Sequence, residues 1–255
     1  MKVISYNIYR HNKQLKKVFN FIQNSNADII CLQEVPKIFL KKLQTDNPNK
    51  FKINYSNEYF IKSNHKKSIL LYNVILSKYK IDKIKEIPHI EHNKFPIYYR
   101  WINKYDNLDI KGIYIDITTQ TGEQFRIFNS HLECIASPNF RINQFKNLYT
   151  HKSLNKHNIF VGDYNVFANP ILSPFIGFLS GYKSKDFMVI EKNQFKKLFE
   201  ILNLKNIFHK KRTFKKLPFQ TDFIVVDKNI EFDMPIVHKS ELNGSDHYPI
   251  SVELN

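Results

Sequence analysis

The chain has little cysteine and no long apolar run. Only Cys31 and Cys134 occur in 255 residues, too few for a disulfide framework. No apolar run approaches the roughly 18 residues of a membrane span, so any membrane contact is expected to be peripheral. Residues 1–7 lack the apolar core of a signal peptide, and no lipidation motif or internal repeat is present. We therefore expect an intracellular protein of the cytoplasm or nucleus.

Acidic residues are also scarce. There are 23 Asp and Glu against 39 Lys and Arg, which gives a formal charge of +16 and a pI near 9.6. This balance favours a polyanionic partner, either nucleic acid or an anionic lipid surface. Because the basic residues are spread along the chain, an equally good interpretation is that they only solvate the surface.

The composition favours one folded domain. Hydrophobic residues at 42% and aromatic residues at 15% are enough for a sizeable core. No composition break or Pro/Gly/Ser-rich linker divides the chain. We expect a single domain that spans residues 1–255.

The first 36 residues show an α/β pattern. Residues 2–8 alternate with the period of a strand, residues 15–22 carry apolar side chains at helical spacing, and residues 29–32 form a buried strand. Asn7 and Glu34 lie at or just past the ends of these strands. Polar residues at the carboxyl ends of strands in α/β proteins form sites above the sheet.

The rest of the chain is richer in short strands. Residues 118–123 have the composition of a hairpin turn, and residues 78–104 predict a long surface loop. Helices are predicted for residues 140–154 and 195–202. Strands are predicted for residues 51–55, 69–76, 109–117, 124–129, 159–161, 223–226, 234–237 and 248–254.

The stretch of residues 158–165 is the first candidate for chemistry. Its apolar run predicts a buried strand, and Gly162 then lets the backbone turn so that Asp163 and Asn165 leave the strand end together. A carboxylate can bind a cation or orient a water, and an amide can donate to a reacting oxygen. Taken alone, Gly-Asp-x-Asn is also an ordinary turn composition.

Similar polar residues follow other predicted strands. Carboxylates, amides and imidazoles of this kind suit one divalent cation, one activated water and one phosphorus centre. Each residue has a structural alternative, as a solvated charge, a core histidine or a turn former. Together they favour a site, and the set is Asn7, Glu34, His131, Asp163, Asn165, Asp222, Asp246 and His247.

Six short motifs in this order resemble the endonuclease/exonuclease/phosphatase superfamily of metal-dependent phosphoesterases. They are Ser-Tyr-Asn-Ile at 5–8, Leu-Gln-Glu-Val at 32–35, Ser-His-Leu-Glu at 130–133, Gly-Asp-Tyr-Asn at 162–165, Thr-Asp-Phe-Ile at 221–224 and Ser-Asp-His at 245–247. The resemblance implies an α+β fold, a four-layer α/β/β/α sandwich with two mostly antiparallel mixed β-sheets. It also implies a site at one edge of the sheets.

The resemblance assigns a metal site. Glu34 would be the main ligand of Mg²⁺, or of Mn²⁺ in its place, with Asn7 beside it and Asp246 close to the same region. It leaves the number of metal ions open.

The resemblance also assigns catalytic roles. Asp163 would orient or deprotonate the attacking water, and Asn165 would hold the nucleophile or a phosphate oxygen. His247, oriented by Asp222, would contact the scissile phosphate, and His131 would donate to another phosphate oxygen. Whether Asp163 or His247 is the general base stays open.

Members of the superfamily cleave DNA, RNA, phosphoinositides and sphingomyelin, so the substrate must be inferred from other features. Aromatic and basic residues alternate around Arg100, Trp101 and Arg212, where bases could stack and phosphates pair, although a loop anchored in the core explains them equally. The His-Leu-Glu run with Arg141 and Gln144 resembles the branch that removes tyrosyl adducts from 5′ DNA ends. For these two residues we expect a structural role.

We therefore predict a Mg²⁺-dependent phosphodiesterase that acts on nucleic acid. One alternative is a phosphoinositide or sphingomyelin-type phosphoesterase that works on an anionic lipid surface. Another is an inactive nucleic-acid-binding module.

Overall fold

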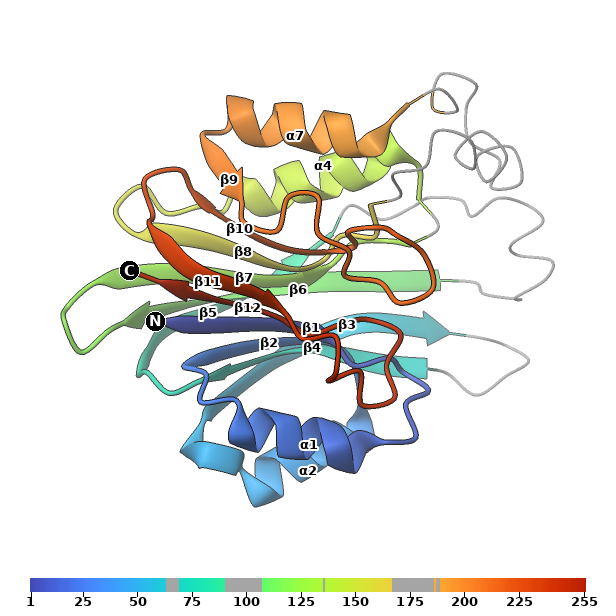
Figure 1. The fold of residues 1–255 in the computed structure, drawn as a ribbon, viewed down its shortest axis with the longest axis vertical. Helices are drawn as coiled ribbons and strands as arrows, with labels where there is room; N and C mark the ends of the chain where they lie inside the picture. The colour runs from blue at the N-terminus through green and yellow to red at the C-terminus, as the bar shows by residue number, and fades with distance from the viewer. Residues whose placement is uncertain (63–68, 90–106, 135, 167–185, 187–188) are drawn as a thin grey trace.

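The computed structural model describes residues 1–62, 69–89, 107–134, 136–166, 186 and 189–255. Two β-sheets lie face to face, with one group of helices outside each sheet (Figure 1). This arrangement confirms the predicted four-layer sandwich. None of the helices in these ranges is long and apolar enough to cross a membrane.

The first sheet contains six strands and one parallel pair. The parallel pair is β1 with β2, which are joined through helix α1, and the other neighbours are antiparallel. The order is β11 (Phe232–Val237), β12 (Ile250–Leu254), β1 (Lys2–Asn7), β2 (Ile29–Pro36), β4 (Ile69–Ser77) and β3 (Lys52–Lys62).

The second sheet repeats this plan. Its parallel pair is β7 with β8, which are joined through helix α4. The order is β5 (Ile81–Pro88), β6 (Asn107–Thr118), β7 (Gln124–His131), β8 (His157–Asp163), β10 (Asp222–Asp227) and β9 (Leu204–Asn206). Strands β3 and β6 also pair with each other, which joins the two sheets along one edge.

Helices cover the outer face of each sheet. On the first sheet lie α1 (Leu15–Asn24), α2 (Lys37–Asp46) and the 3₁₀ turn η1 (Pro48–Lys50), and on the second lie α4 (Pro138–Tyr149) and α7 (Glu191–Ile201). Ser137 caps helix α4, since its Oγ accepts from the Phe140 N–H at 3.4 Å.

Both faces of the central strands are buried. Val3 and Cys31 face the second sheet, whereas their chain neighbours Ile4 and Leu32 face helices α1 and α2. Strands β7 and β8 behave in the same way, with aromatic side chains packed under α4 and α7. This double burial explains why these strands read as continuous apolar runs.

A buried ion pair ties β6 to β7. Asp116 accepts from Arg126 Nε at 2.7 Å and from Arg126 Nη2 at 2.8 Å, and Lys156 Nζ lies 3.0 Å from the same carboxylate. These cations outweigh the effect of burial and hold the pKa of Asp116 below its usual range.

Three segments differ from the sequence-based prediction. The expected loop at residues 78–104 contains strand β5, most of whose side chains are exposed, so its pairing with β6 left no apolar alternation to detect. Helix α2 was not predicted, although Phe39, Leu40 and Leu43 are buried along it. Helix α4 also ends at Tyr149, five residues earlier than predicted.

Candidate active site

The predicted polar residues gather at the carboxyl ends of the two parallel strand pairs. A hollow of about 240 Å³ opens there, and Glu34, His131, Asp163, Asp246 and His247 are among its lining residues. The strand register places His131 opposite Asp163 across β7 and β8, and Asp222 opposite Asp163 across β8 and β10. The fold thus brings together residues up to 240 positions apart in the sequence, from Asn7 to His247.

Gly162 permits the approach of β8 to β7. Its φ is +147°, and a Cβ at this position would lie 1.8 Å from the backbone oxygen of Ser130. No side chain larger than hydrogen fits between the two strands here. Gly162 therefore allows the backbones of β7 and β8 to come close together, and Asp163 follows directly after this contact.

Asp163 is the centre of the arrangement. Its Oδ2 accepts from Asn7 Nδ2 at 2.9 Å and lies 3.6 Å from Nε2 of both His131 and His247. Its Oδ1 accepts from the backbone N–H of Asn165 at 2.9 Å. Burial raises the pKa of this carboxyl, and the two imidazoles oppose that rise.

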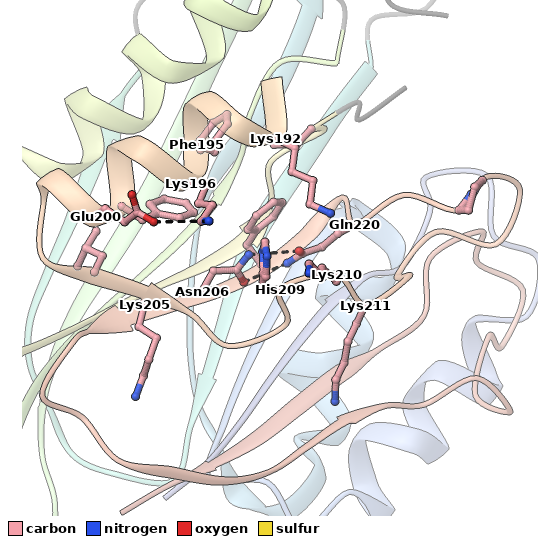
Figure 2. Close-up of a pocket in the computed structure, with 15 residues that line it drawn as sticks. Lys192, Phe195, Lys196, Glu200, Lys205, Asn206, His209, Lys210, Lys211 and Gln220 are labelled. Atoms are coloured by element: carbon pink, nitrogen blue, oxygen red, sulfur yellow. Dashed lines mark hydrogen bonds and ion pairs between the residues drawn. The ribbon is translucent and has the colours of Figure 1, made fainter. Parts of the chain in front are cut away.

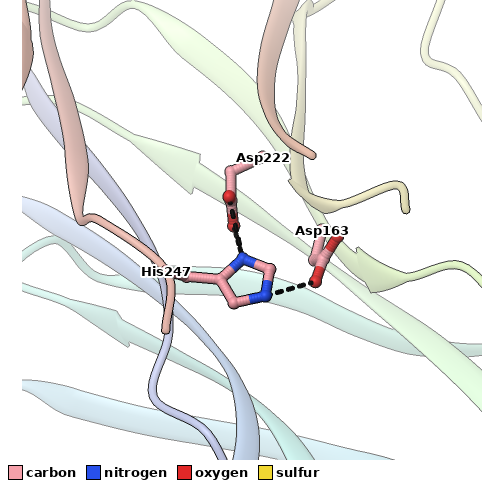
Figure 3. Close-up of side chains that lie close together, drawn as sticks. All are labelled: Asp163, Asp222 and His247. Carbon is pink, nitrogen blue, oxygen red and sulfur yellow. Dashed lines mark hydrogen bonds and ion pairs between the residues drawn. The ribbon is translucent and has the colours of Figure 1, made fainter. Parts of the chain in front are cut away.

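His247 is held by Asp222. Its Nδ1 lies 2.9 Å from Asp222 Oδ2, and its Nε2 points to Asp163 (Figure 3). Thr221 Oγ1 donates to the same Asp222 oxygen at 2.8 Å. Burial lowers the pKa of His247, but Asp222 and Asp163 raise it more, to about 10. The imidazolium can therefore donate from Nε2 at neutral pH.

His131 is held in the same way by Glu58, which the sequence analysis missed. Its Nδ1 lies 2.7 Å from Glu58 Oε1. Burial lowers the pKa of His131, while Glu58 and Asp163 raise it to about 9. Asn165 Nδ2 lies 2.8 Å from Nε2, where a neutral imidazole can accept, whereas the imidazolium can donate toward Asp163.

Glu58 also fixes the backbone of Glu34. Its Oε2 accepts from the Glu34 N–H at 2.6 Å, and Glu34 adopts a left-handed φ of +55° at an irregularity between β2 and β4. A non-glycine residue in this conformation costs roughly 1 to 3 kcal/mol, which the surroundings must offset. One buried carboxylate thus contacts both the imidazole of His131 and the backbone of Glu34, a candidate metal ligand.

The oxygen atoms of the site suit a hard divalent cation. Glu34, Asp163 and Asp246 line one hollow, and carboxylate oxygens are the ligands that Mg²⁺ prefers. Asn7 lies beside Glu34, as predicted, with its amide nitrogen toward the carboxylates. Its Nδ2 faces Asp163 and lies 3.4 Å from Glu34 Oε1, while its Oδ1 accepts from the Tyr9 N–H at 3.0 Å. In this conformation it bridges two carboxylates through nitrogen.

A second set of possible ligands is less suited to a cation. Within the described ranges, Asp163, Asp222 and His247 have ligand atoms that all lie within 4.8 Å of one another. However, Asp222 already accepts from His247 Nδ1, and a protonated imidazole has no lone pair to donate. We therefore regard this cluster as a hydrogen-bonded group and not as a metal site.

The three residues that were predicted to bind substrate stay predictions. Arg100 and Trp101 lie outside the described residues. Arg212 is exposed, and its guanidinium donates to the backbone oxygens of Phe214 and Lys215. It thus shapes the loop in which Phe214 contacts the ring of His247, with 4.9 Å between the ring centroids.

Arg141 and Gln144 shape the turn that follows His131. Arg141 is 1% exposed, forms two hydrogen bonds with Glu191 at 2.6 and 2.8 Å, and donates to the backbone oxygens of residues 133, 134 and 136. Gln144 Oε1 accepts from the Glu133 N–H at 3.0 Å. These contacts agree with the structural role that we expected.

Comparisons with known proteins agree with the motifs. No curated protein matches the chain by sequence. The catalytic domain of human Nocturnin with a bound sulfate anion superposes with a TM-score of 0.69 and 16% identity, over 100% of this chain and 93% of that one. ANGEL2, a 2′,3′-cyclic phosphatase in complex with adenosine-2′,3′-vanadate, gives 0.63 and 13%, over 99% and 94%.

A third solved structure is the mannosyl-6-phosphatase Bt3783 of Bacteroides thetaiotaomicron VPI-5482. Its TM-score is 0.64 with 17% identity, over 100% of this chain and 99% of that one. At these identities the structural likenesses establish the fold alone. The model of the endonuclease/exonuclease/phosphatase family, however, matches residues 4–247. The chain therefore belongs to the endonuclease/exonuclease/phosphatase family, whose members are phosphoesterases.

Proposed function

We propose that the protein is a Mg²⁺-dependent phosphodiesterase that acts on nucleic acid. The observation that carries this proposal is the surrounding of Asp163. One of its oxygens faces two imidazoles at 3.6 Å, and each imidazole is held at Nδ1 by a buried carboxylate of its own. A carboxylate between two fixed N–H donors suits the attack of water on an anionic phosphate.

Each residue has a role in this mechanism. Asp163 orients the attacking water and accepts its proton, while Asn7 fixes the carboxylate through Nδ2. His247 and His131 donate from Nε2 to phosphate oxygens as negative charge builds on them. Mg²⁺, held by Glu34 with Asp246 nearby, would neutralise phosphate charge and polarise the phosphorus centre.

Each imidazole has a carboxylate at its Nδ1 that sets the orientation of the ring. A carboxylate at Nδ1 orients the ring and favours its charged form, as Asp222 does for His247 and Glu58 for His131. Both carboxylates are fully or nearly fully buried, at 0% and 1% exposure, so they hold the rings without competition from water.

Charge supports nucleic acid as the substrate. The formal charge of +16 favours a polyanion over a neutral headgroup such as that of sphingomyelin. The bound adenosine-2′,3′-vanadate of ANGEL2 is a nucleotide analogue in a protein of the same fold. The sub-hypothesis of a 5′-tyrosyl-DNA activity depends only on the His-Leu-Glu run with Arg141 and Gln144.

A substrate panel tests the proposal. The purified protein would be assayed with Mg²⁺, with Mn²⁺ and with EDTA on single-stranded RNA, abasic duplex, 5′-tyrosyl DNA, phosphoinositides and sphingomyelin. We expect metal-dependent hydrolysis of a nucleic acid, with binding that weakens as salt rises. Hydrolysis restricted to the lipids would favour a lipid phosphoesterase. Nucleic-acid binding with no hydrolysis under any condition would favour an inactive binding module.

A further inference from the structure

A second hollow lies outside the catalytic site. It has a volume of about 290 Å³ and lies between helix α7, strands β9 and β10 and the segment that leads to residue 220 (Figure 2). It is separated from the catalytic hollow by the end of β10. Thr221 lines the catalytic hollow, whereas its neighbour Gln220, together with Phe223, lines the second one.

The side chains around this hollow are strongly basic. Five lysines and one histidine line it with a single acid, Glu200, so the lysines and the acid give a net charge of +4: Lys192, Lys196, Lys205, Lys210 and Lys211 against Glu200. Such an excess of one sign in a concave site attracts anions from solution.

Three of these lysines already have partners. Lys196 Nζ lies 3.8 Å from Glu200 Oε1, Lys205 lies over the ring of Phe232, and Lys211 donates to the backbone oxygen of Pro235 at 2.8 Å. In Figure 2, Lys205 and Lys211 extend away from the centre of the hollow. These three lysines add to the positive electrostatic potential of the hollow, but we do not assign them to a ligand.

Lys192 and Lys210 are different. Neither makes a hydrogen bond or ion pair within the described ranges, and Figure 2 shows Lys192 pointing toward Gln220 and His209. Partial burial lowers the pKa of His209, and Lys192 and Lys210 lower it further, so both ammonium groups act on this imidazole. Lys192, Lys210 and His209 thus line one hollow, in which the lining acid Glu200 faces Lys196 instead.

The deeper wall is apolar. Phe195, Phe199, Leu204 and Phe223 form it, and two amides complete it. Gln220 Nε2 donates to Asn206 Oδ1 at 3.0 Å, and Asn206 Nδ2 donates back to Gln220 Oε1 at 3.2 Å. A basic rim above an aromatic wall suits a molecule with an anionic end and a planar ring.

We propose that this hollow binds a small phosphorylated molecule with a planar ring, of the mononucleotide type. Its phosphate lies between Lys192, Lys210 and His209, and its ring lies against the wall formed by Phe195 and Phe199. The volume is near the lower end of ligand pockets, roughly 300 to 1,000 Å³, which suits one such molecule. This site is distinct from the catalytic one and does not depend on the proposed reaction.

The NMR signals of the His209 imidazole can show whether a ligand binds in this hollow. Adenosine monophosphate would be titrated into the full-length protein at low salt, with the His209 ring signals followed by NMR and assigned with a His209→Gln variant. An anion beside the ring favours its charged form, so we expect a saturable shift and a higher pKa of His209. Adenosine should give no response, and ribose 5-phosphate should bind more weakly because it lacks the ring.

Nucleotide binding by matched lysine variants tests whether the ligand binds in this hollow or elsewhere on the basic surface. Lys192→Ala with Lys210→Ala should weaken binding roughly tenfold or more, because both charged donors to the phosphate are lost. Lys13→Ala with Lys80→Ala removes the same charge from exposed lysines elsewhere and should leave binding unchanged. Glu200→Gln should strengthen binding.

Three outcomes would overturn the proposal. The first is no response of His209 to adenosine monophosphate. The second is equal binding of ribose 5-phosphate, which would remove the role of the aromatic wall. The third is loss of the response in Asp163→Asn, which would place the nucleotide in the catalytic hollow. Wild-type melting temperature in the double lysine variant would show that it is folded.

Discussion

Glu58→Gln is the substitution that best tests how the two halves of the site are coupled. Glu58 is 1% exposed, and its two oxygens serve different partners: Oε1 holds His131 at 2.7 Å and Oε2 accepts from the Glu34 N–H at 2.6 Å. Glutamine has the same shape, but it can offer an oxygen to only one of them. Its NH₂ group then faces either the imidazole or the backbone N–H.

The size of the effect follows from these contacts. A hydrogen bond to a charged group contributes roughly 1.5 to 3 kcal/mol, and a buried unpaired donor costs about as much. We therefore expect the free energy of unfolding to fall by about 2 kcal/mol, which lowers the melting temperature by roughly 4 to 8 °C for a chain of this length. If His131 loses its orientation, kcat should fall roughly 10- to 100-fold with a smaller change in KM.

Steady-state kinetics with Mg²⁺ and thermal unfolding measure both effects. Glu86→Gln is the matched control, because this carboxylate is exposed on β5, lies 3.4 Å from Lys111 Nζ and is separated from the strand of His131 by β6. Since Glu58 acts through His131, the double variant Glu58→Gln, His131→Asn should lose no more activity than His131→Asn alone. Unchanged kcat in Glu58→Gln, or fully additive losses in the double variant, would refute this reasoning.

Three further substitutions test the frame and the metal site. Gly162→Ala should lower the free energy of unfolding by roughly 3 kcal/mol or more in urea, because its Cβ would lie 1.8 Å from Ser130 O, whereas Gly122→Ala, with no atom within 4 Å, should cost less. Asp116→Asn should destabilise the protein near neutral pH. The folded-state pKa of Asp116 is depressed, so its contribution to stability is present above the unfolded pKa of about 4 and is lost as pH falls through the folded value. The difference in free energy of unfolding between wild type and Asp116→Asn should therefore disappear in acid. Glu34→Gln should raise the Mg²⁺ concentration needed for half-maximal activity, and an unchanged requirement would argue against Glu34 as a ligand.

Residues at strand ends were predictable from the sequence because strand period and end position can be read locally. Asp163 follows an apolar run and a glycine, and Glu34 follows another run before a proline. The parallel pairs β1 with β2 and β7 with β8 then bring these ends to one edge of the molecule. The four-layer sandwich was predicted from the resemblance that the six motifs carry.

Glu58 could not be found in this way. It lies within strand β3, next to an irregularity between Asn57 and Tyr59 in the pairing with β4, and no motif surrounds it. Its importance arises only from contacts with His131 and Glu34, which are 73 and 24 residues away in the sequence. The predicted strand at residues 51–55 also ended before Glu58, so its alternation gave no signal.

Composition did not predict which basic side chains on the surface are available to bind a ligand. Arg212 stays predicted to bind substrate because it lies among basic and aromatic residues, and no sequence pattern indicated that its guanidinium contacts the backbone of its own loop. Lys192 and Lys210, which have no ion-pair partner among the described residues, come from different segments, and no sequence pattern joined them. Side-chain pairing, which decides which charges remain available, depends on the tertiary structure.

The metal-dependent activity of Asp163→Asn tests the role of Asp163 most sharply. Asparagine keeps the shape of Asp163 and removes the charge between His131 and His247, while Asp82→Asn on exposed β5 serves as the control. With the preferred substrate from the panel and Mg²⁺, we expect kcat to fall roughly 10²- to 10⁴-fold in Asp163→Asn, with the fold retained by circular dichroism. Wild-type turnover in that variant would contradict the assignment of Asp163 as the water-activating carboxylate.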